Sequence, residues 1–373
     1  MTAPRLEIDL GKITHNARCL SAWLTTEGVD VTGVTKGVCG RPEVARAMLD
    51  SGVSSLADAR VENVERMRAA DIACPISLIR PPMLSQAARV VRSCELSYNT
   101  EPTVIKALAA AARAVDKVHH VVLMVEMGDM RDGIMPADVA EVAAQVVATP
   151  GVALKGVGAN FGCLSGVAPD ADAMARLSSL ADEVEGACGP YVQIVSGGGS
   201  ASLSWAFGPE PKRRVNDLRL GEAILLGLDP TTCEPIDGLK TDAFALFAEV
   251  IEVKVKAERP LLIAVDPASK ALRLVPNRHG GARSILALGA QDTDVGGLTT
   301  PEGFTCLGGT SDHLVMRSER TASRVGDVVE LRPNYDALMR CMNAPSVAKT
   351  ILDDGRPPRR RPSGRAACRL VEI

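Results

Sequence analysis

A single lysine stands at the end of an apolar, strand-like segment. Lys36 follows VTGVT at 31–35 and precedes GVCG, a short apolar pair between two glycines. Lysine is rarely buried without a partner or a chemical task. An apolar surrounding favours the neutral amine, which can attack an aldehyde to form a Schiff base. The alternative interpretation is a lysine whose ammonium group reaches water from a strand end.

A glycine-rich turn could bind a phosphate group. SGGGSAS at 196–202 follows a predicted strand and opens a helical segment. Glycines let backbone amides approach an anion, the start of a helix offers unpaired N–H donors, and Ser200 and Ser202 add hydroxyl groups. The alternative is a flexible turn with a serine cap. A Schiff-base lysine and a phosphate site in one chain together favour pyridoxal 5′-phosphate (PLP) as the cofactor.

Both features depend on the elements that carry them. Up to about residue 230, short β-branched segments alternate with segments of 3.6-residue periodicity, which predicts strands that are each followed by a helix. The predicted strands are 31–37, 53–58, 75–80, 94–98, 118–126, 153–160, 191–197 and 217–226. The predicted helices include 42–50, 62–70, 85–93, 102–115, 137–148 and 170–186.

Eight such units within about two hundred residues predict a fold of the α/β class, a (β/α)8 TIM barrel rather than an open sheet. In this fold the C-terminal strand ends carry the active site. Lys36, Arg131, Asn160 and the turn 196–202 lie at or just after predicted strand ends, and the eighth predicted strand carries Arg219. The barrel therefore predicts one site that contains both the lysine and the glycine-rich turn.

A second domain follows the barrel. From about residue 236, predicted strands succeed one another without helices, at 244–257, 261–266, 283–290, 304–309, 312–317 and 327–332. We therefore predict a PLP-binding barrel at 9–235 and an all-β C-terminal domain at 236–373 together with 1–8. The strand-like RLEIDL at 5–10 could also join the barrel. The tail DDGRPPRRRPSGRAACRLVEI is expected to be a solvated linker that could end in a strand at 368–373.

Composition excludes several classes of function. The net charge of −3 and the aromatic content of 3% speak against nucleic acid and anionic membranes as partners. No apolar segment is long enough to span a bilayer, and the N-terminus does not resemble a signal peptide. The ten cysteines are scattered without zinc-like spacing. They predict reduced thiols, no metal site and a cytoplasmic protein.

Nine short motifs follow one another along the chain. They are VTKGVCG at 34–40, DARVEN at 58–63, GDMRDG at 128–133, GANF at 158–161, SGGGS at 196–200, RLGEAILLG at 219–227, QD at 291–292, TSDH at 310–313 and NY at 334–335. With these motifs, over about residues 5–350, the chain resembles the alanine/ornithine racemase family. The resemblance implies a fold-type III PLP enzyme and a head-to-tail homodimer whose active sites use both chains.

The resemblance also implies roles for single residues. Lys36 would form the Schiff base and serve as one of two acid/base groups. The cofactor phosphate would be held by the hydroxyl groups and amides of Gly198, Gly199, Ser200, Gly221 and Tyr335. Asn160 would lie against the cofactor ring, and Arg131 near the cofactor O3 and the substrate carboxylate.

Arg219 distinguishes between two reactions. The resemblance implies that it faces the pyridine nitrogen of the cofactor. A carboxylate there would keep that nitrogen protonated and suit decarboxylation, whereas an arginine disfavours the pyridinium. Related decarboxylases use glutamate at this place, so Arg219 favours racemisation. The alternative is that Arg219 simply pairs with Glu222 or Asp217.

Racemisation needs a second acid/base group on the opposite face of the substrate α-carbon. Alanine racemases supply a tyrosine from the partner's β-domain, but no tyrosine lies between Tyr191 and Tyr335 here. The candidates are Ser311, Asp312, His313 and His279, although His313 could be structural and His279 a turn residue. Ornithine racemases usually show SGGNS and DSR where this chain has Gly199 and Ala59, which leaves the substrate open.

The expected activity is racemisation of a free amino acid with a basic side chain. Asp312 resembles the aspartate that related decarboxylases place against the distal amine of ornithine or lysine, where a carboxylate would pair with an ammonium group. The alternative is that Asp312 orients the backbone or binds the α-amino or carboxylate region of the substrate, as an aspartate at this place does in alanine racemases. Two other functions stay open, a non-catalytic PLP carrier and a diamino-acid decarboxylase. The carriers lack a β-domain, and the decarboxylases have a cysteine in place of Ser311.

Overall fold

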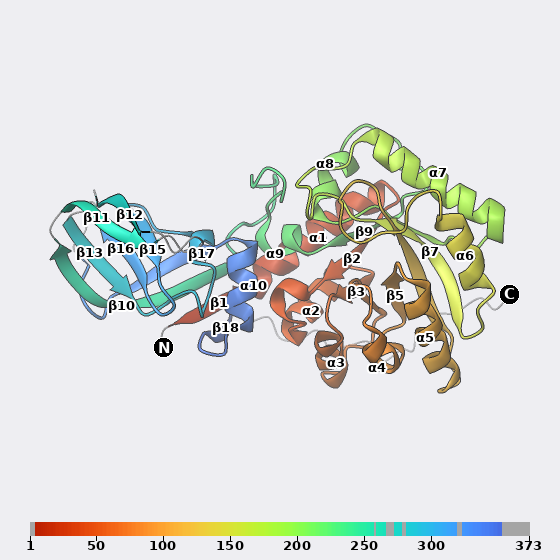
Figure 1. Ribbon diagram of the computed structural model, residues 1–373, viewed down its shortest axis with the longest axis horizontal. Coiled ribbons are helices and arrows are strands. Elements are labelled where there is room, and N and C mark those ends of the chain that lie inside the picture. The colour runs from red at the N-terminus through yellow and green to blue at the C-terminus, as the bar shows by residue number, and fades with distance from the viewer. Residues whose placement is uncertain (1–3, 257–258, 266–271, 278–280, 319–322, 353–373) are drawn as a thin grey trace.

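A barrel and a separate sheet form the two parts of the molecule (Figure 1). The computed structural model describes residues 4–256, 259–265, 272–277, 281–318 and 323–352. His279 and the predicted strand at 368–373 lie outside the described residues. Among the described helices, none has the length and apolar character needed to cross a membrane. In the same residues, no group of three or more His, Cys, Asp or Glu side chains is arranged to hold a metal ion.

Eight parallel strands close into a barrel in chain order, which confirms the predicted TIM barrel. They are β2 (Asp30–Val34), β3 (Ser55–Asp58), β4 (Ile76–Leu78), β5 (Leu96–Asn99), β6 (His119–Val125), β7 (Val152–Ala159), β8 (Ile194–Ser196) and β9 (Asp217–Leu220). Apolar side chains from β5 and β6 form a cluster of their own, with Leu96, Tyr98, Val122 and Met124. Barrels of this size are filled by such side chains.

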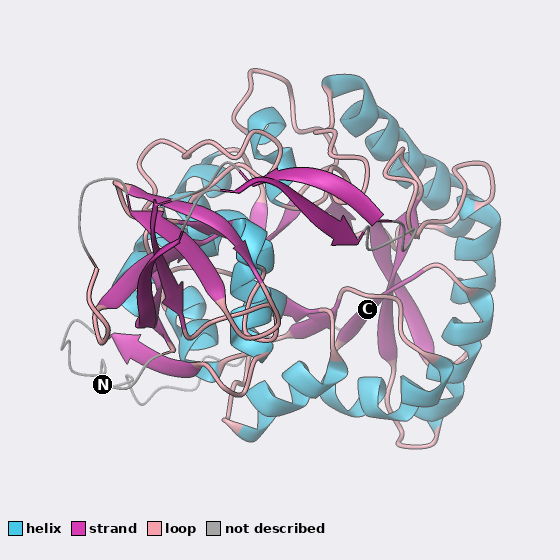
Figure 2. Cartoon of the chain, turned by 60° about the vertical axis from the view of Figure 1, so that its left-hand side comes forward, coloured by secondary structure: helices cyan, strands magenta, loops and turns pink. Residues whose placement is uncertain are grey.

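Helices lie outside the barrel strands (Figure 2). They are α1 (Leu10–Thr26), α2 (Pro42–Leu49), α3 (Val61–Ala69), α4 (Ala87–Ser93), α5 (Pro102–Arg113), α6 (Val139–Val147), α7 (Ala171–Cys188), α8 (Leu203–Ala206) and α9 (Glu222–Leu226). Short 3-10 turns are η1 (Lys36–Val38), η2 (Leu84–Gln86), η3 (Ser200–Ser202) and η4 (Val295–Gly297). Local sequence sets several starts: Asp9 and Asp170 accept N-cap hydrogen bonds, and prolines open α2 and α5.

Two predicted strands were too long at the barrel mouth. β2 ends at Val34 and Lys36 begins η1, while β9 ends at Leu220 and the rest of the predicted strand 217–226 forms α9. Gly221, with φ −121° and ψ −69°, leaves the strand conformation between β9 and α9. The prediction was wrong there because a short, fully buried apolar run has no periodicity that separates helix from strand.

The second part is an eight-stranded, mainly antiparallel sheet in the order β14-β17-β10-β13-β16-β15, in which β1 also pairs with β10 and β18 pairs with β1. Its strands are β1 (Arg5–Asp9), β10 (Phe244–Lys256), β13 (Gly281–Leu286), β14 (Leu298–Thr299), β15 (Phe304–Gly309), β16 (Leu314–Ser318), β17 (Val328–Pro333) and β18 (Ala348–Leu352). β11 (Arg259–Val265) and β12 (Leu272–Asn277) form a separate hairpin. The N-terminal strand β1 pairs with β10 and β18, so it joins this sheet and not the barrel.

One helix of this C-terminal part was not expected from the sequence. α10 (Tyr335–Asn343) begins at Asn334, whose side chain accepts a hydrogen bond from the Ala337 amide at 2.9 Å. It packs against η1 of the barrel and lies between the sheet and the barrel (Figure 1). α10 therefore brings a segment of the C-terminal part to the turn that carries Lys36.

Candidate active site

Lys36 lies at the C-terminal mouth of the barrel, just beyond β2. Its Nζ is 5.9 Å from the centroid of the Tyr335 ring at the start of α10. Gly37 allows this approach, since a Cβ there would lie 2.9 Å from Tyr335 Cε2. Two of the predicted site residues, far apart in the sequence, thus meet in the fold.

The Tyr335 hydroxyl has an unusual environment. Its oxygen is buried and makes no hydrogen bond within the described chain. Burial raises the pKa of this hydroxyl well above its usual value. A buried hydroxyl without a partner is costly, so this atom suits a ligand that carries hydrogen-bond acceptors.

The residue before Lys36 is fixed by a buried carboxylate. Thr35 Oγ1 donates to Asp58 Oδ2 at 2.8 Å. The other oxygen of Asp58 accepts from the Arg60 amide and from Asn63 Nδ2, each at 2.9 Å. Although burial raises the pKa of Asp58, these hydrogen bonds oppose the shift. They hold the end of β2 and so define where Lys36 leaves the strand.

The glycine-rich turn after β8 lies beside the start of α9. Ser200 is buried, and its Oγ accepts a hydrogen bond from the Ala223 amide at 3.1 Å. Gly198 has φ +98°, and a Cβ there would lie 2.7 Å from Ser202 Oγ. The first amides of a helical segment have no partner within it, and the starts of η3 and α9 lie together here.

Two further glycines allow neighbouring backbone segments to approach closely in this region. A Cβ at Gly199 would lie 3.2 Å from the Arg219 carbonyl oxygen, and one at Gly221 would lie 3.2 Å from Val34 Cβ. Val34 is two residues before Lys36. The predicted phosphate-binding residues and the predicted Schiff-base lysine therefore line one region of the barrel mouth.

Arg219 is buried, and its guanidinium group donates three hydrogen bonds. It donates to Ser196 Oγ at 2.5 Å, to the Ala159 carbonyl at 2.7 Å and to Asn160 Oδ1 at 2.9 Å. Its guanidinium lies 4.9 Å from the centroid of the Tyr98 ring. These contacts hold Arg219 in one orientation at the end of β9, facing the barrel mouth.

Arg219 reaches Asp217 only through another residue. The Ser196 hydroxyl accepts from Arg219 and donates to Asp217, whose carboxylate also accepts from Thr32 Oγ1 at 2.6 Å. No ion pair joins Arg219 to Asp217 or Glu222 in the described part of the chain. The simple pairing considered from the sequence is thus replaced by a relayed one.

Asn160 connects Arg219 with the loop that carries Arg131. Asn160 Nδ2 donates to Asp132 Oδ1 at 3.5 Å, and that oxygen is 2.5 Å from Arg131 Nε. Arg131 Nε lies 4.0 Å from Asp129 Oδ2. The other oxygen of Asp129 accepts hydrogen bonds from the backbone amides of Cys163 and Leu164, in the loop after β7. The structure thus brings Arg131, Asn160 and Arg219 into one polar network.

Glu222 also lies in this region, although the sequence analysis named it only as an alternative partner of Arg219. It is the first residue of α9, and burial raises the pKa of its carboxyl to about 7. The negative charge of Asp336 on α10 contributes to this increase, while Lys36 opposes it. Its position directly after Gly221 in RLGEAILLG was the available signal, but the segment had been assigned to a strand.

Ser311, Asp312 and His313 lie elsewhere, in the turn between β15 and β16. Gln291 Nε2 donates to Asp312 Oδ1 at 2.8 Å, and the Thr310 amide donates to the His313 carbonyl at 2.8 Å. Ser311 and Asp312 are exposed. Across the residues described, no hydrogen bond, ion pair or ring contact joins this turn to Lys36 of the same chain.

Comparison with known proteins identifies the family. The model of the alanine racemase N-terminal domain matches residues 8–230. The chain belongs to the alanine racemase family. It is 31% identical to an ornithine racemase of Acetoanaerobium sticklandii, a match that covers 94% of this chain and 99% of that protein. It is 34% identical to a lysine racemase of Thermotoga maritima, over 94% of this chain and 98% of that protein.

Solved structures of other proteins share the fold. An alanine racemase from E. faecalis superimposes with a TM-score of 0.67 at 19% identity, covering 93% of this chain and 98% of that one. A D-threonine aldolase from Filomicrobium marinum gives a TM-score of 0.72 at 15% identity, covering 92% and 89%. The cofactor of the alanine racemase family is PLP.

Proposed function

We propose that this chain is a PLP-dependent racemase that interconverts the L- and D-forms of a free amino acid with a basic side chain. The observation that carries the proposal is the similarity, over nearly the whole of both chains, to an ornithine racemase and a lysine racemase. The arrangement of Lys36, the glycine-rich turn and Arg219 around one barrel mouth supports it.

The residues around Lys36 fit the cofactor. The orphaned Tyr335 hydroxyl and the amides at the starts of η3 and α9 would hold its phosphate, together with Ser200. Gly198 and Gly221 keep side chains out of this space. Lys36 would carry the cofactor covalently, and Asn160 would lie against the ring. When bound, the cofactor offers an aldehyde to the substrate amine and withdraws electrons from the α-carbon.

Arg219 would control how strongly the cofactor withdraws electrons. A guanidinium facing the pyridine nitrogen stays protonated and therefore keeps a proton off that nitrogen. Its three hydrogen-bond acceptors and the Tyr98 ring prevent it from turning away. Because a weaker electron sink favours rapid return of the α-proton, this arrangement suits racemisation better than decarboxylation.

Proton transfer requires a group on each face of the α-carbon. Lys36 Nζ would remove or return the α-proton on one face. The other group would come from the partner subunit's turn 310–313, with Ser311, Asp312 and His313 as candidates. Arg131, held by Asp132, would bind the substrate carboxylate.

We expect a homodimer with shared sites from this division of residues. Loops at the barrel mouth expose apolar side chains, among them Met130 at 77%, Leu164 at 65% and Val167 at 66%. Exposed apolar side chains gathered next to a site are typical of a protein contact. The exposed turn 310–313, which does not reach Lys36 of its own chain, would complete the site of the other subunit.

All nine described cysteines are free, which supports a reducing compartment such as the cytoplasm.

Asp312 would select the basic side chain. Its carboxylate would pair with the distal ammonium or guanidinium group of ornithine, lysine or arginine. A neutral substrate would leave this charge unpaired, which typically costs about 2–5 kcal/mol in a partly desolvated site.

The test is incubation of the PLP-loaded enzyme with single L-amino acids, followed by separation of D-enantiomers and amine products. We expect D-ornithine and D-lysine without cadaverine or putrescine, and Asp312→Asn should raise KM for these substrates far more than for alanine. Faster turnover of alanine or serine would contradict the basic substrate but keep the racemase. Amine products would indicate a decarboxylase, and no turnover of any amino acid a PLP carrier.

A further inference from the structure

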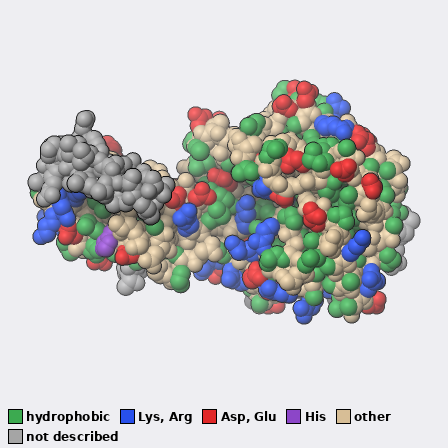
Figure 3. Space-filling model, viewed as in Figure 1, with side chains coloured by type: hydrophobic (Ala, Val, Ile, Leu, Met, Phe, Trp, Pro, Cys, Tyr) green, Lys and Arg blue, Asp and Glu red, His purple; other side chains and the backbone are tan. Residues whose placement is uncertain are grey.

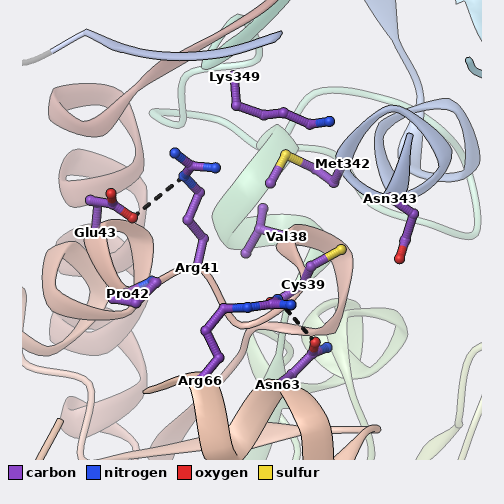
Figure 4. A pocket seen from close by; sticks show the side chains of 10 residues that line it. All are labelled: Val38, Cys39, Arg41, Pro42, Glu43, Asn63, Arg66, Met342, Asn343 and Lys349. Carbon is purple, nitrogen blue, oxygen red and sulfur yellow. Dashed lines mark hydrogen bonds and ion pairs between the residues drawn. The ribbon is translucent and has the colours of Figure 1, made fainter. Parts of the chain in front are cut away.

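A pocket of about 440 Å³ lies beside the barrel mouth, where η1, α2 and α3 face α10 and β18 (Figure 4). Neither Lys36 nor Tyr335 lines it, so it is distinct from the region assigned to the cofactor. Pockets of this size hold small organic ligands in other proteins. On the face shown in Figure 3, Lys and Arg side chains gather where α2 and α10 lie in Figure 1.

The pocket contains more positive than negative side chains. Arg41, Arg66 and Lys349 line it, and Glu43 is its only carboxylate among the described lining residues. In Figure 4 the three cationic groups lie around Val38. Three cations against one carboxylate leave two positive charges uncompensated.

These cations have few partners of their own. Arg41 Nε lies 3.4 Å from Glu43 Oε2, but both atoms are buried and neither makes a hydrogen bond. Arg66 donates to the Cys39 carbonyl and, at 3.3 Å, to Asn63 Oδ1, and Lys349 donates to the Ala344 carbonyl. No carboxylate within the described ranges pairs with either cation. Burial lowers the pKa of Lys349, and the charge of Arg41 adds to this effect.

We propose that this pocket binds a small organic anion with two negative charges, in the form of a phosphoryl group or a pair of carboxylates. The guanidinium groups of Arg41 and Arg66 match either oxyanion in geometry, and Lys349 adds a third donor. Val38 and Met342 contribute an apolar surface for the rest of the ligand.

The pocket and the candidate active site share two elements, the turn η1 and the helix α10. Val38 and Cys39 continue the turn that begins with Lys36, and Arg66 holds the Cys39 carbonyl. α10 begins with Tyr335 and ends at the pocket with Met342 and Asn343. A bound anion would therefore fix both elements that bring Lys36 and Tyr335 together. This effect on activity rests on the proposed racemase function, whereas binding does not.

The binding test uses calorimetric titration of the PLP-loaded enzyme, in which the cofactor phosphate occupies its own site. Inorganic phosphate and succinate are compared with acetate at constant ionic strength. We expect saturable binding of one divalent anion per chain and none of acetate. Tighter binding of phosphate would assign a phosphoryl ligand, and tighter binding of succinate a dicarboxylate.

Lys349→Gln should weaken this binding about tenfold or more, because it removes one charged donor. Arg340→Gln is the matched control, since this exposed residue lies on α10 outside the pocket and carries the same charge. No saturable binding at millimolar concentrations, or equal weakening by both variants, would overturn the proposal. Arg66→Gln provides a second variant if Lys349→Gln is poorly folded.

Racemisation of ornithine with and without the anion then tests the link to the active site. A changed rate in the wild type that Lys349→Gln abolishes supports the link, and an unchanged rate with proven binding refutes it. If the enzyme racemises no amino acid but still binds the anion, the proposed function is wrong and the anion-binding proposal is supported.

Discussion

Lys36 leaves β2 at a point that several residues define together. Thr35 is tied to the buried Asp58, Gly37 makes room for the Tyr335 ring, and Val34 packs against Gly221. The amine thereby lies 5.9 Å from the centroid of the Tyr335 ring. A lysine positioned in this way can carry the cofactor and then act on the substrate.

The proposed role of Lys36 predicts a specific covalent product. Borohydride reduction of the PLP-loaded enzyme should attach the cofactor to Lys36, and Lys36→Ala should abolish racemisation. Lys155→Ala, which removes a half-buried lysine from barrel strand β7, is the control and should keep activity. Peptide mass mapping after reduction measures the label. A label on a different lysine, or full activity of Lys36→Ala, would contradict the mechanism.

Glu222 predicts a pH dependence of stability. Its pKa is raised from 4.5 to about 7, so the folded protein keeps this proton at pH values where the unfolded chain has released it. The stability that the neutral carboxyl contributes is complete below about pH 4.5 and is lost as the pH rises through about 7.

Glu222→Gln, which cannot ionise, isolates this effect. We expect the free energy of unfolding of the cofactor-free wild type, relative to this variant, to fall by about 2–3 kcal/mol between pH 4.5 and 8. Urea denaturation at several pH values measures it. The exposed Glu101→Gln serves as the control, with no pH-dependent difference expected. Parallel pH curves for wild type and Glu222→Gln would refute the raised pKa.

At the scale of elements, the proposed phosphate-binding region consists of the starts of two helical segments. η3 follows the turn after β8, α9 follows β9, and the hydrogen bond from Ala223 to Ser200 joins them. α10 approaches from the C-terminal part and adds Tyr335. Glycines join η3 and α9 to the strands before them, at 197–199 after β8 and at Gly221 after β9.

Gly198→Ala should therefore weaken cofactor binding. The backbone there has φ +98°, which alanine adopts with strain, and the new Cβ would lie 2.7 Å from Ser202 Oγ. We expect the dissociation constant for PLP to rise about tenfold or more, as measured by equilibrium dialysis. Gly186→Ala is the control, because a Cβ in this helical position meets no atom within 4 Å. Equal affinities of both variants would show that the turn does not bind the phosphate.

At the scale of the whole molecule, the barrel and the C-terminal sheet carry complementary halves of the proposed site. Lys36 and the glycine-rich turn belong to the barrel, while Asp312 lies in an exposed turn of the sheet with no contact to them. Two chains arranged head to tail would form two complete sites, each with the barrel residues of one chain and the exposed turn of the other.

Hybrid dimers test this arrangement. Lys36→Ala and Asp312→Ala homodimers should each be nearly inactive at low ornithine concentration, whereas each hybrid keeps one intact site. Random exchange of equal amounts should restore up to about a quarter of wild-type activity, because half the dimers are hybrids with one working site. Lys36→Ala mixed with itself is the control. No recovery despite subunit exchange, followed by mass spectrometry, would contradict a shared site.

The sequence alone was sufficient for the barrel, the C-terminal sheet and most of the residues at the barrel mouth. Buried parallel strands and amphipathic helices carry different periodicities, and parallel strand ends meet at one face of a barrel. Lys36, Asn160, Ser200 and Arg219 could therefore be grouped before the fold was seen. The family motifs added Tyr335, which periodicity would not have connected to them.

Only the tertiary structure decided the rest. Helix α10 and the contact between Tyr335 and Lys36 depend on where the end of the chain returns, which local patterns do not encode. The raised pKa of Glu222 arises from burial and from Asp336, and the cluster of Arg41, Arg66 and Lys349 joins residues from both ends of the chain. Charges that are remote in sequence affect one another only after folding has brought them close and excluded water.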